Sequence, residues 1–325
     1  MNNNDFVVFG LSDGKHLAKS VCDVLNFPLG KSKTIKFADG EILTEIGESV
    51  RNKDVFVFQS FSSPANDNIM EFLIFVDSLR RASAKNIYAV IPYYGYARQD
   101  RKAHGRQPIT ARLIADLLER VGVKRVTTFD LHSSQIQGFF DIAVDDLRAG
   151  PIILSYIVKK YQNEIKNKEL TVVSPDQGGV KRARLIASEL NVNLSIIDKR
   201  RNVVNDMEVM NILGNVENKV CLMIDDMIDT GNTIIKGAKA LKNCGAKSVI
   251  ICCTHPVFSK DCIINLQNSI ADEVITTDTI FLPENKHFEK LKIVSVKNFL
   301  AELLETVSKN GSISDIYKKY SIINS

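Results

Sequence analysis

Residues 220–233 read Val-Cys-Leu-Met-Ile-Asp-Asp-Met-Ile-Asp-Thr-Gly-Asn-Thr, and a segment with helical periodicity begins at their end. The run 220–224 is short, apolar and continuous, which is typical of a strand that is covered on both faces. Two acids end this strand, and small and hydroxyl residues lead into a helix predicted over 233–244. A strand, a short loop and a helix in this order indicate an α/β fold.

The same pattern recurs along the rest of the chain. Further short runs rich in Val and Ile lie at 6–9, 55–59, 87–91, 126–129, 172–173, 194–197, 249–253 and 274–276. Amphipathic segments of a length suited to crossover helices lie between them, at 69–82, 109–121 and 180–190. We therefore expect mainly parallel sheets flanked by helices.

An internal repeat indicates two similar halves. Leu-Glu-Arg-Val-Gly-Val-Lys-Arg-Val at 118–126 aligns with Leu-Lys-Asn-Cys-Gly-Ala-Lys-Ser-Val at 241–249, and His132 aligns with His255 at the same offset. The alternative is that Gly-x-Lys before a strand is only a common helix ending. A chain of 325 residues has room for two domains of about 150 residues. We expect domains over 1–148 and 149–305, with a tail, 306–325, that packs back on the first.

Composition excludes several classes of protein. The chain is 45% hydrophobic, and 42 Lys and Arg against 38 Asp and Glu give a net charge of only +4, too weak to predict nucleic-acid binding. No apolar run approaches the roughly 18 residues of a membrane span, and the start lacks a signal-peptide pattern. Six cysteines without a C-x-x-C motif indicate a reducing compartment. The expected location is the cytoplasm, with neither nucleic acid nor membrane as partner.

The loop after 220–224 has the chemistry of a phosphate site. Backbone N–H groups and the Thr230 and Thr233 hydroxyls at a helix N-terminus can hold a phosphate dianion. Asp225 and Asp226 would repel phosphate, so they are expected to face ribose hydroxyls or a metal-bound water. The simpler alternative, Asp and Thr capping an ordinary helix, does not explain two adjacent acids at a strand end.

Two basic segments follow other predicted strands. Arg98 and Gln99 come after the strand 87–91 and a Gly/Tyr-rich turn, at the sheet edge where α/β proteins bind ligands, and they can bind a polyphosphate. Lys199 and Arg201 come after the strand 194–197 and precede the polar segment 202–207, which we interpret as a mobile loop. Their charges could stabilise a transferring phosphoryl group. Without the other motifs, either segment could also be a run of charged residues that simply faces solvent.

These motifs together resemble the ribose-phosphate pyrophosphokinase family, of the class I-like type. The resemblance rests on Phe-Ala-Asp-Gly-Glu at 37–41, the segment 92–102, Asp-Leu-His at 130–132, Ser-Pro-Asp at 174–176, 198–201 and 225–233. It implies two phosphoribosyltransferase-type domains, each with a mainly parallel sheet flanked by helices. It also implies transfer of the β,γ-diphosphoryl group of ATP to the 1-hydroxyl of ribose 5-phosphate, for nucleotide biosynthesis. Mg²⁺ as cofactor and a homo-oligomer, a hexamer built from dimers, are further implications.

The resemblance also implies roles for individual residues. Lys199 and Arg201 are the expected catalytic residues, and His132 and Asp176 the expected metal ligands, although Mg²⁺ prefers oxygen and Asp176 is the better physical candidate. The expected ATP-binding residues are Phe37, Asp39, Gly40, Glu41, Arg98 and Gln99, with the 37–41 turn serving the adenine of a neighbouring subunit. The expected ribose 5-phosphate residues are Arg201, Asp225, Asp226, Asp229, Thr230, Gly231, Asn232 and Thr233. Ser49, Arg51, Ser312 and Ser314 resemble a regulatory site.

One position departs from the family's pattern, and two alternatives stay open. The family's loop usually reads Asp-Thr-x-Gly-Thr, whereas Asn232 stands here in the place of that glycine. We expect Asn232 either to adopt a left-handed backbone or to lie where the phosphate approaches closely. A phosphoribosyltransferase that consumes the diphosphate would not need 37–41 and 98–102. A non-catalytic regulatory subunit would not need the catalytic and metal-binding residues, which are all present.

Overall fold

The computed structural model describes residues 6–201, 208–309 and 311–320, and the chain divides into two compact units. The first unit contains the described residues of Met1–Arg148 together with Thr279–Phe281 and Val296–Ile316. The second contains Ala149–Asp278 and Leu282–Ser295. More of the C-terminal part than the expected tail thus belongs to the first unit, where helix α9 (Lys297–Ser308) packs on helix α1 (Lys15–Leu25). Residues 317–320 of the expected tail group with the second unit instead.

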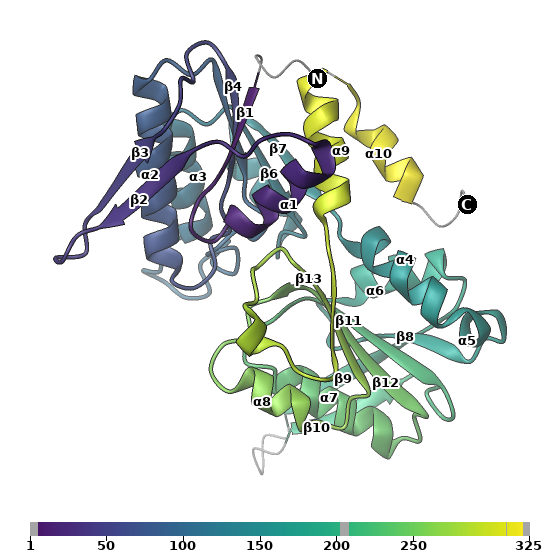
Figure 1. Ribbon diagram of the computed structural model, residues 1–325. Helices are drawn as coiled ribbons and strands as arrows, with labels where there is room; N and C mark the ends of the chain where they lie inside the picture. The colour runs from purple at the N-terminus through teal and green to yellow at the C-terminus, as the bar shows by residue number, and fades with distance from the viewer. Residues whose placement is uncertain (1–5, 202–207, 310, 321–325) are drawn as a thin grey trace. The chain divides into compact units, whose positions relative to one another are not determined.

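The first unit is built on a five-stranded parallel sheet in the order β1-β4-β5-β6-β7. Helices α2 (Ala65–Arg81) and α3 (Thr110–Val121) cover one face of this sheet, and α1 and α9 cover the other (Figure 1). A 3-10 turn, Ser134–Phe139, follows β6, and α10 spans Ile313–Tyr320. The strands are β1 (Phe6–Gly10), β4 (Asp54–Phe58), β5 (Asn86–Val90), β6 (Arg125–Phe129) and β7 (Ala143–Leu147).

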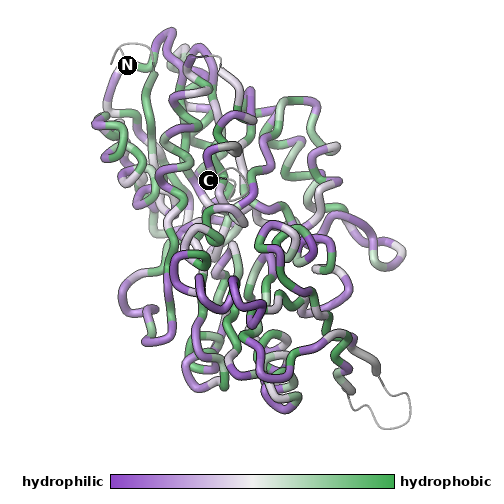
Figure 2. Tube along the Cα trace, turned by 90° about the vertical axis from the view of Figure 1, so that its right-hand side faces the viewer, coloured by the Kyte–Doolittle hydropathy of each residue, from purple (hydrophilic) through white to green (hydrophobic). Residues whose placement is uncertain are grey.

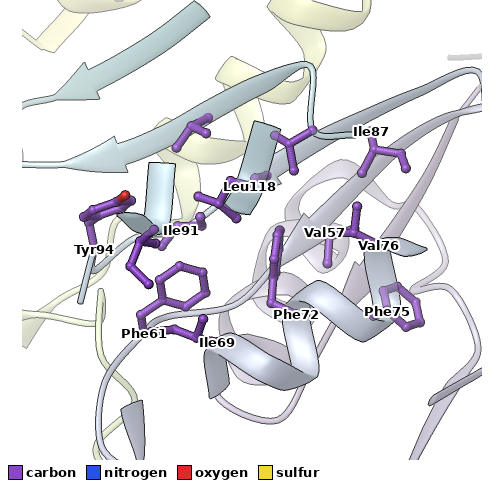
Figure 3. Close-up of a cluster of buried hydrophobic side chains, with 14 of the residues drawn as sticks. Val57, Phe61, Ile69, Phe72, Phe75, Val76, Ile87, Ile91, Tyr94 and Leu118 are labelled. Atoms are coloured by element: carbon purple, nitrogen blue, oxygen red, sulfur yellow. The ribbon is translucent and has the colours of Figure 1, made fainter. Parts of the chain in front are cut away.

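The core of the first unit explains why its strands read as continuous apolar runs. Helix α2 directs Ile69, Phe72 and Val76 toward the sheet (Figure 3). The rings of Phe61 and Phe72 meet edge to face, with centroids 5.6 Å apart. On the opposite face of the sheet, Phe129 of β6 meets Phe299 of α9 at 6.1 Å. With apolar helices on both faces, nearly every residue of β1 and β4 is buried, and these strands lack the alternation of a half-exposed sheet.

A separate antiparallel hairpin carries the 37–41 turn. It consists of β2 (Ser32–Lys36) and β3 (Ile42–Ile46), which the apolar-run pattern did not predict because Thr44 is the only buried residue in these two strands. Polar groups attach the hairpin to α2. Thr34 Oγ1 donates to the buried Glu71 carboxylate at 2.6 Å, and Lys36 Nζ lies 2.7 Å from Asp67 Oδ2. Because Lys36 directly precedes the turn, these contacts hold the hairpin on α2 as far as the turn.

The second unit has a seven-stranded sheet in the order β10-β9-β8-β11-β12-β13-β14, parallel except for the pair β9 and β10. In both units hydrophobic stretches run through the interior, and hydrophilic stretches lie on the outer loops (Figure 2). The strands are β8 (Leu170–Ser174), β9 (Asn193–Arg201), β10 (Glu208–Leu213), β11 (Val220–Ile228), β12 (Ser248–Pro256), β13 (Glu273–Thr277) and β14 (Leu291–Val294). The helices are α4 (Gly150–Lys160), α5 (Gln162–Lys166), α6 (Val180–Glu189), α7 (Asn232–Asn243) and α8 (Cys262–Gln267), with a 3-10 turn at Glu284–Lys286.

The strand order of the second unit reverses between β8 and β11. Strand β8 leads through α6 to β9 on one side, whereas β11 leads through α7 to β12 on the other side. Because such crossovers are right-handed, α6 and α7 cover opposite faces, and the loops after β8 and β11 diverge at the carboxyl edge. This reversal is the place where open α/β sheets bind ligands.

The structure confirms the α/β fold with two mainly parallel sheets, and it corrects local predictions. The repeat corresponds to α3 with β6 and to α7 with β12, and Gly122 and Gly245 between them have φ values of 113° and 85°.

Residues 199–201 were predicted to begin a loop, which is wrong: β9 continues through Arg201 because it pairs with β10. Segment 202–207 lies outside the described residues. No helix in the described part of the chain is long and apolar enough to cross a membrane.

Candidate active site

The acid pair and the phosphate-type loop lie at the strand reversal of the second unit. Asp225 and Asp226 are in the last part of β11, where Asp226 is 4% exposed and Asp225 is partly buried. The Asp226 N–H donates to Asp225 Oδ1 at 2.9 Å. Residues 229–231 then lead into α7, whose first two residues, Asn232 and Thr233, are exposed. An exposed helix N-terminus beside two acids matches a site for a sugar phosphate.

Gly231, not Asn232, has the left-handed backbone in this loop. Gly231 precedes α7 with a φ of 78°, and a Cβ on it would lie 2.9 Å from Cys262 Sγ. Asn232 is the first residue of the helix and does not have a positive φ. The expectation of a left-handed Asn232 is therefore wrong, because the glycine that allows the turn stands one residue earlier. The second alternative, a close approach of phosphate at Asn232, stays a prediction.

An arginine that the sequence did not single out contacts both acids. Arg182 Nη1 in the first turn of α6 lies 3.1 Å from Asp225 Oδ1 and 3.5 Å from Asp226 Oδ1. Burial and the neighbouring Asp226 carboxylate raise the pKa of Asp225 well above its ordinary value, and Arg182 opposes this shift. No sequence pattern indicates this contact, because Arg182 lies in an amphipathic helix among other basic residues.

The loop after β8 carries Asp176 at the same carboxyl edge. Asp176 Oδ1 accepts the Gly179 N–H at 2.9 Å, and the Ser174 hydroxyl donates to the Asp176 carbonyl at 2.7 Å. These bonds fix the loop directly before α6 and Arg182. Strand β9 beside β8 carries Lys199 and Arg201, whose backbones pair with Met210 and Glu208 of β10. The sheet thus brings the expected metal, catalytic and ribose residues of the second unit to one edge.

The 37–41 turn of the first unit is exposed. The Phe37 N–H donates to the Glu41 carbonyl at 2.8 Å, and the Asp39 carboxylate accepts the Glu41 N–H at 3.0 Å. Gly40 has a φ of 96°, and the Phe37 ring is 49% exposed. A large apolar side chain next to exposed polar groups is suited to stacking on a planar ligand.

Arg98 and Gln99 lie at the carboxyl edge of the first unit's sheet, in the segment between β5 and α3. The buried Tyr94 hydroxyl donates to the Ala111 carbonyl at 3.1 Å, and the Ala111 N–H donates to the Gln99 carbonyl at 3.2 Å. These bonds hold the segment on α3, while Arg98 and Gln99 stay exposed. The position at the strand ends agrees with the sequence-based expectation of a ligand site.

His132 is exposed on the loop that follows β6. The loop is tied to β7, because the Asp130 N–H donates to the Leu147 carbonyl at 2.8 Å and the Leu131 N–H donates to Asp146 Oδ1 at 3.0 Å. Among the residues that the structure describes, no group of three or more His, Cys, Asp and Glu could hold a metal ion. His132 belongs to the first unit and Asp176 to the second.

The four expected regulatory residues are all exposed. Ser49 and Arg51 follow β3, and Ser312 and Ser314 lie at the start of α10. All four belong to the first unit.

The raised pKa of Asp225 predicts a pH-dependent stability difference for Asp225→Asn. Between the ordinary value of 3.8 and the raised folded value, the folded protein holds a proton that the unfolded chain has released. The free energy of unfolding of the wild type therefore falls as pH rises through this window, whereas an asparagine does not titrate. Scanning calorimetry should show that the Tm advantage of Asp225→Asn grows from pH 5 to pH 8, to at least about 2 °C.

The matched control for this measurement is Glu289→Gln, which neutralises an exposed acid of the same unit. Its Tm difference from the wild type should not grow over the same pH range. An advantage of Asp225→Asn that stays constant or falls with pH would contradict a raised Asp225 pKa.

Comparisons with known proteins cover nearly the whole chain. Residues 6–122 match the model for the N-terminal domain of ribose phosphate pyrophosphokinase, and residues 143–279 match that for the phosphoribosyl transferase domain. The ribose-phosphate pyrophosphokinase of Fusobacterium nucleatum is 49% identical over 317 residues, covering 98% of this chain and 99% of that protein. Ribose-phosphate pyrophosphokinase 1 of Streptococcus mutans is 48% identical over 320 residues, covering 98% of both chains.

A solved structure agrees with these matches. The crystal structure of phosphoribosylpyrophosphate synthetase from Mycobacterium smegmatis superposes with a TM-score of 0.89 at 41% identity, covering 95% of this chain and 100% of that one. With the α/β fold and the strand-end motifs, these similarities establish the family and its reaction. The chain belongs to the ribose-phosphate pyrophosphokinases, which make 5-phosphoribosyl diphosphate from ATP and ribose 5-phosphate.

Proposed function

We propose that the second unit holds ribose 5-phosphate at the strand reversal and that the first unit supplies groups that bind ATP. The observation that carries this division is the clustering at the β8/β11 edge, where the acid pair, the Asp176 loop and the N-terminus of α7 come together. The acids accept hydrogen bonds from the ribose hydroxyls. Residues 229–233 bind the 5-phosphate through backbone N–H groups and hydroxyls.

The reaction is an in-line displacement at the β-phosphorus of ATP. The 1-hydroxyl oxygen of the ribose forms the new bond to the β-phosphorus, while the bond from the β-phosphorus to the oxygen bridging to the α-phosphorus breaks, and AMP leaves with that oxygen. Lys199 and Arg201 neutralise the charge that develops on the transferring group. Arg98 and Gln99 bind the polyphosphate, and the 37–41 turn binds the adenine. Most of the rate enhancement then comes from positioning and electrostatics.

Magnesium is the proposed cofactor, and the chemistry of Asp176 fits it. A carboxylate is a preferred Mg²⁺ ligand, and one of its oxygens is already oriented by the Gly179 N–H. His132 is exposed and is the proposed second ligand. Because Mg²⁺ keeps several waters and binds substrate phosphates, it does not need three protein ligands. When bound, it would supply positive charge that neutralises the phosphate oxygens of ATP.

Assembly, regulation and location complete the proposal. The exposed Phe37 and its turn are suited to completing a site on an adjacent subunit, in a homo-oligomer built from dimers up to a hexamer. Ser49, Arg51, Ser312 and Ser314 are proposed to bind an anionic effector. All six cysteines are free, which supports a cytoplasmic location.

The identity of the nucleotide product tests the reaction directly. The protein is incubated with ATP, Mg²⁺ and ribose 5-phosphate, and the products are separated by ion-exchange chromatography. AMP and 5-phosphoribosyl diphosphate are expected in equal amounts. Formation of ADP would show that a single phosphoryl group is transferred, and the proposal would fail.

Lys199→Ala tests the proposed charge stabilisation. We expect kcat to fall by at least about 100-fold, whereas the affinity for ATP changes little, because the interaction is made mainly in the transition state. The matched control is Lys247→Ala, at an exposed position next to the amino end of β12. If Lys199→Ala kept kcat within about threefold of the wild type, the proposed role of Lys199 would be wrong.

Dilution tests whether the 37–41 turn completes a neighbour's site. Specific activity should fall as light scattering shows the oligomer dissociating, and the loss should appear mainly as a higher KM for ATP. Monomers with full specific activity would exclude a shared site.

A further inference from the structure

Arg182 joins two carboxylates that a regular strand would separate. Successive side chains of a strand point to opposite faces, so neighbouring acids such as Asp225 and Asp226 do not ordinarily reach one cation. Here a single atom, Arg182 Nη1, lies within 3.5 Å of an oxygen of each. The Asp226 N–H also turns toward Asp225 Oδ1. The guanidinium and the local backbone thus gather both acids around one point.

The position of Arg182 in the fold holds its side chain in contact with the two acids. Arg182 is the third residue of α6, a helix that packs on β8, β9 and β11 and directly follows the Asp176 loop. Its side chain is 27% exposed, against 23% for Asp225 and 5% for Asp226. The ion pair is therefore mostly screened from solvent, where a lost partner costs more than on a surface.

We propose that Arg182 is a positioning residue for the ribose site: it holds Asp225 and Asp226 in the orientation in which both accept hydrogen bonds from ribose hydroxyls. This inference rests on the proposed assignment of the acid pair to ribose.

The groups around Asp225 and Asp226 explain why the two acids need the Arg182 guanidinium. Asp225 faces Asp226 on its own strand, Cys253 on the neighbouring β12 and Arg182 on α6. Without the guanidinium, the partly buried Asp225 and the buried Asp226 lose the contact that holds both at one point, and their repulsion turns one of them away. A displaced acid no longer accepts the ribose hydroxyl in the required direction. The site would then lose affinity for ribose 5-phosphate, but its groups for ATP would be unchanged.

Steady-state kinetics of three variants test this role. Arg182→Met removes the charge but keeps most of the side-chain volume, and we expect it to raise the KM for ribose 5-phosphate by at least about 10-fold. The KM for ATP should stay within about threefold of the wild type. Because both contacts come from one nitrogen, a lysine ammonium can replace it, so Arg182→Lys should restore the KM for ribose 5-phosphate to within about threefold.

The double variant Asp225→Asn with Arg182→Met separates positioning from direct substrate contact. If Arg182 acts through the pair, adding Arg182→Met to Asp225→Asn raises the KM for ribose 5-phosphate by a smaller factor than in the wild type, because only the contact with Asp226 remains to be lost. A rise of about 10-fold or more in this background would mean that Arg182 acts independently of Asp225, which overturns the proposal. This comparison also serves if Arg182→Met alone does not fold, because removing one acid relieves the repulsion.

Further results would contradict the proposed role of Arg182 or the assignment of the acid pair to ribose. An Arg182→Met enzyme with an unchanged KM for ribose 5-phosphate, equal rises in both KM values, or failure of Arg182→Lys to restore binding would each overturn the proposal. If Asp225→Asn itself left the KM for ribose 5-phosphate unchanged, the assignment of the acid pair to ribose would be wrong, and this result is distinguishable from a failure of Arg182 alone.

Discussion

The reversal of strand order between β8 and β11 is the constraint on which the acceptor site depends. Because right-handed crossovers send α6 and α7 to opposite faces, the loops after these two strands separate at the carboxyl edge. One loop presents Asp176 and leads into Arg182, and the other presents the N-terminus of α7 beside the acid pair. Arg182 and Asp225, which are 43 residues apart in sequence, become neighbours through this topology.

Much of the fold was predictable from apolar runs, because parallel strands covered on both faces are continuous and rich in Val and Ile. Strands β5, β6, β11 and β12 follow this rule. The hairpin of β2 and β3 does not follow this rule, since nearly all of its strand residues are exposed or only partly buried and polar groups attach it to α2. The extension of β9 through Arg201 was also missed, because it depends on pairing with β10 and not on hydrophobicity.

The sequence predicts the place of some residues of the candidate site but not of others. The positions of Arg98 and Asp176 follow from sequence, since a polar motif after an apolar run must lie at the carboxyl edge. The prediction that the acid pair ends its strand is wrong, because β11 continues through Ile228, where it still pairs with β12. The left-handed Gly231 and the helical Asn232 could not be assigned in advance, because the start of α7 depends on the packing of Gly231 against Cys262. Arg182 was missed for a similar reason: its contact with Asp225 and Asp226 joins two elements through tertiary structure.

Hydrogen exchange followed by mass spectrometry tests most directly whether ribose 5-phosphate binds at the reversal. With ribose 5-phosphate alone, the amides of 229–233 should exchange more slowly, because their N–H groups bind the phosphate. An ATP analogue that cannot transfer its diphosphoryl group should leave these amides unchanged and slow exchange in the first unit around Arg98 and Gln99. Protection by ribose 5-phosphate that is absent from 229–233 and appears only in the first unit would contradict this account.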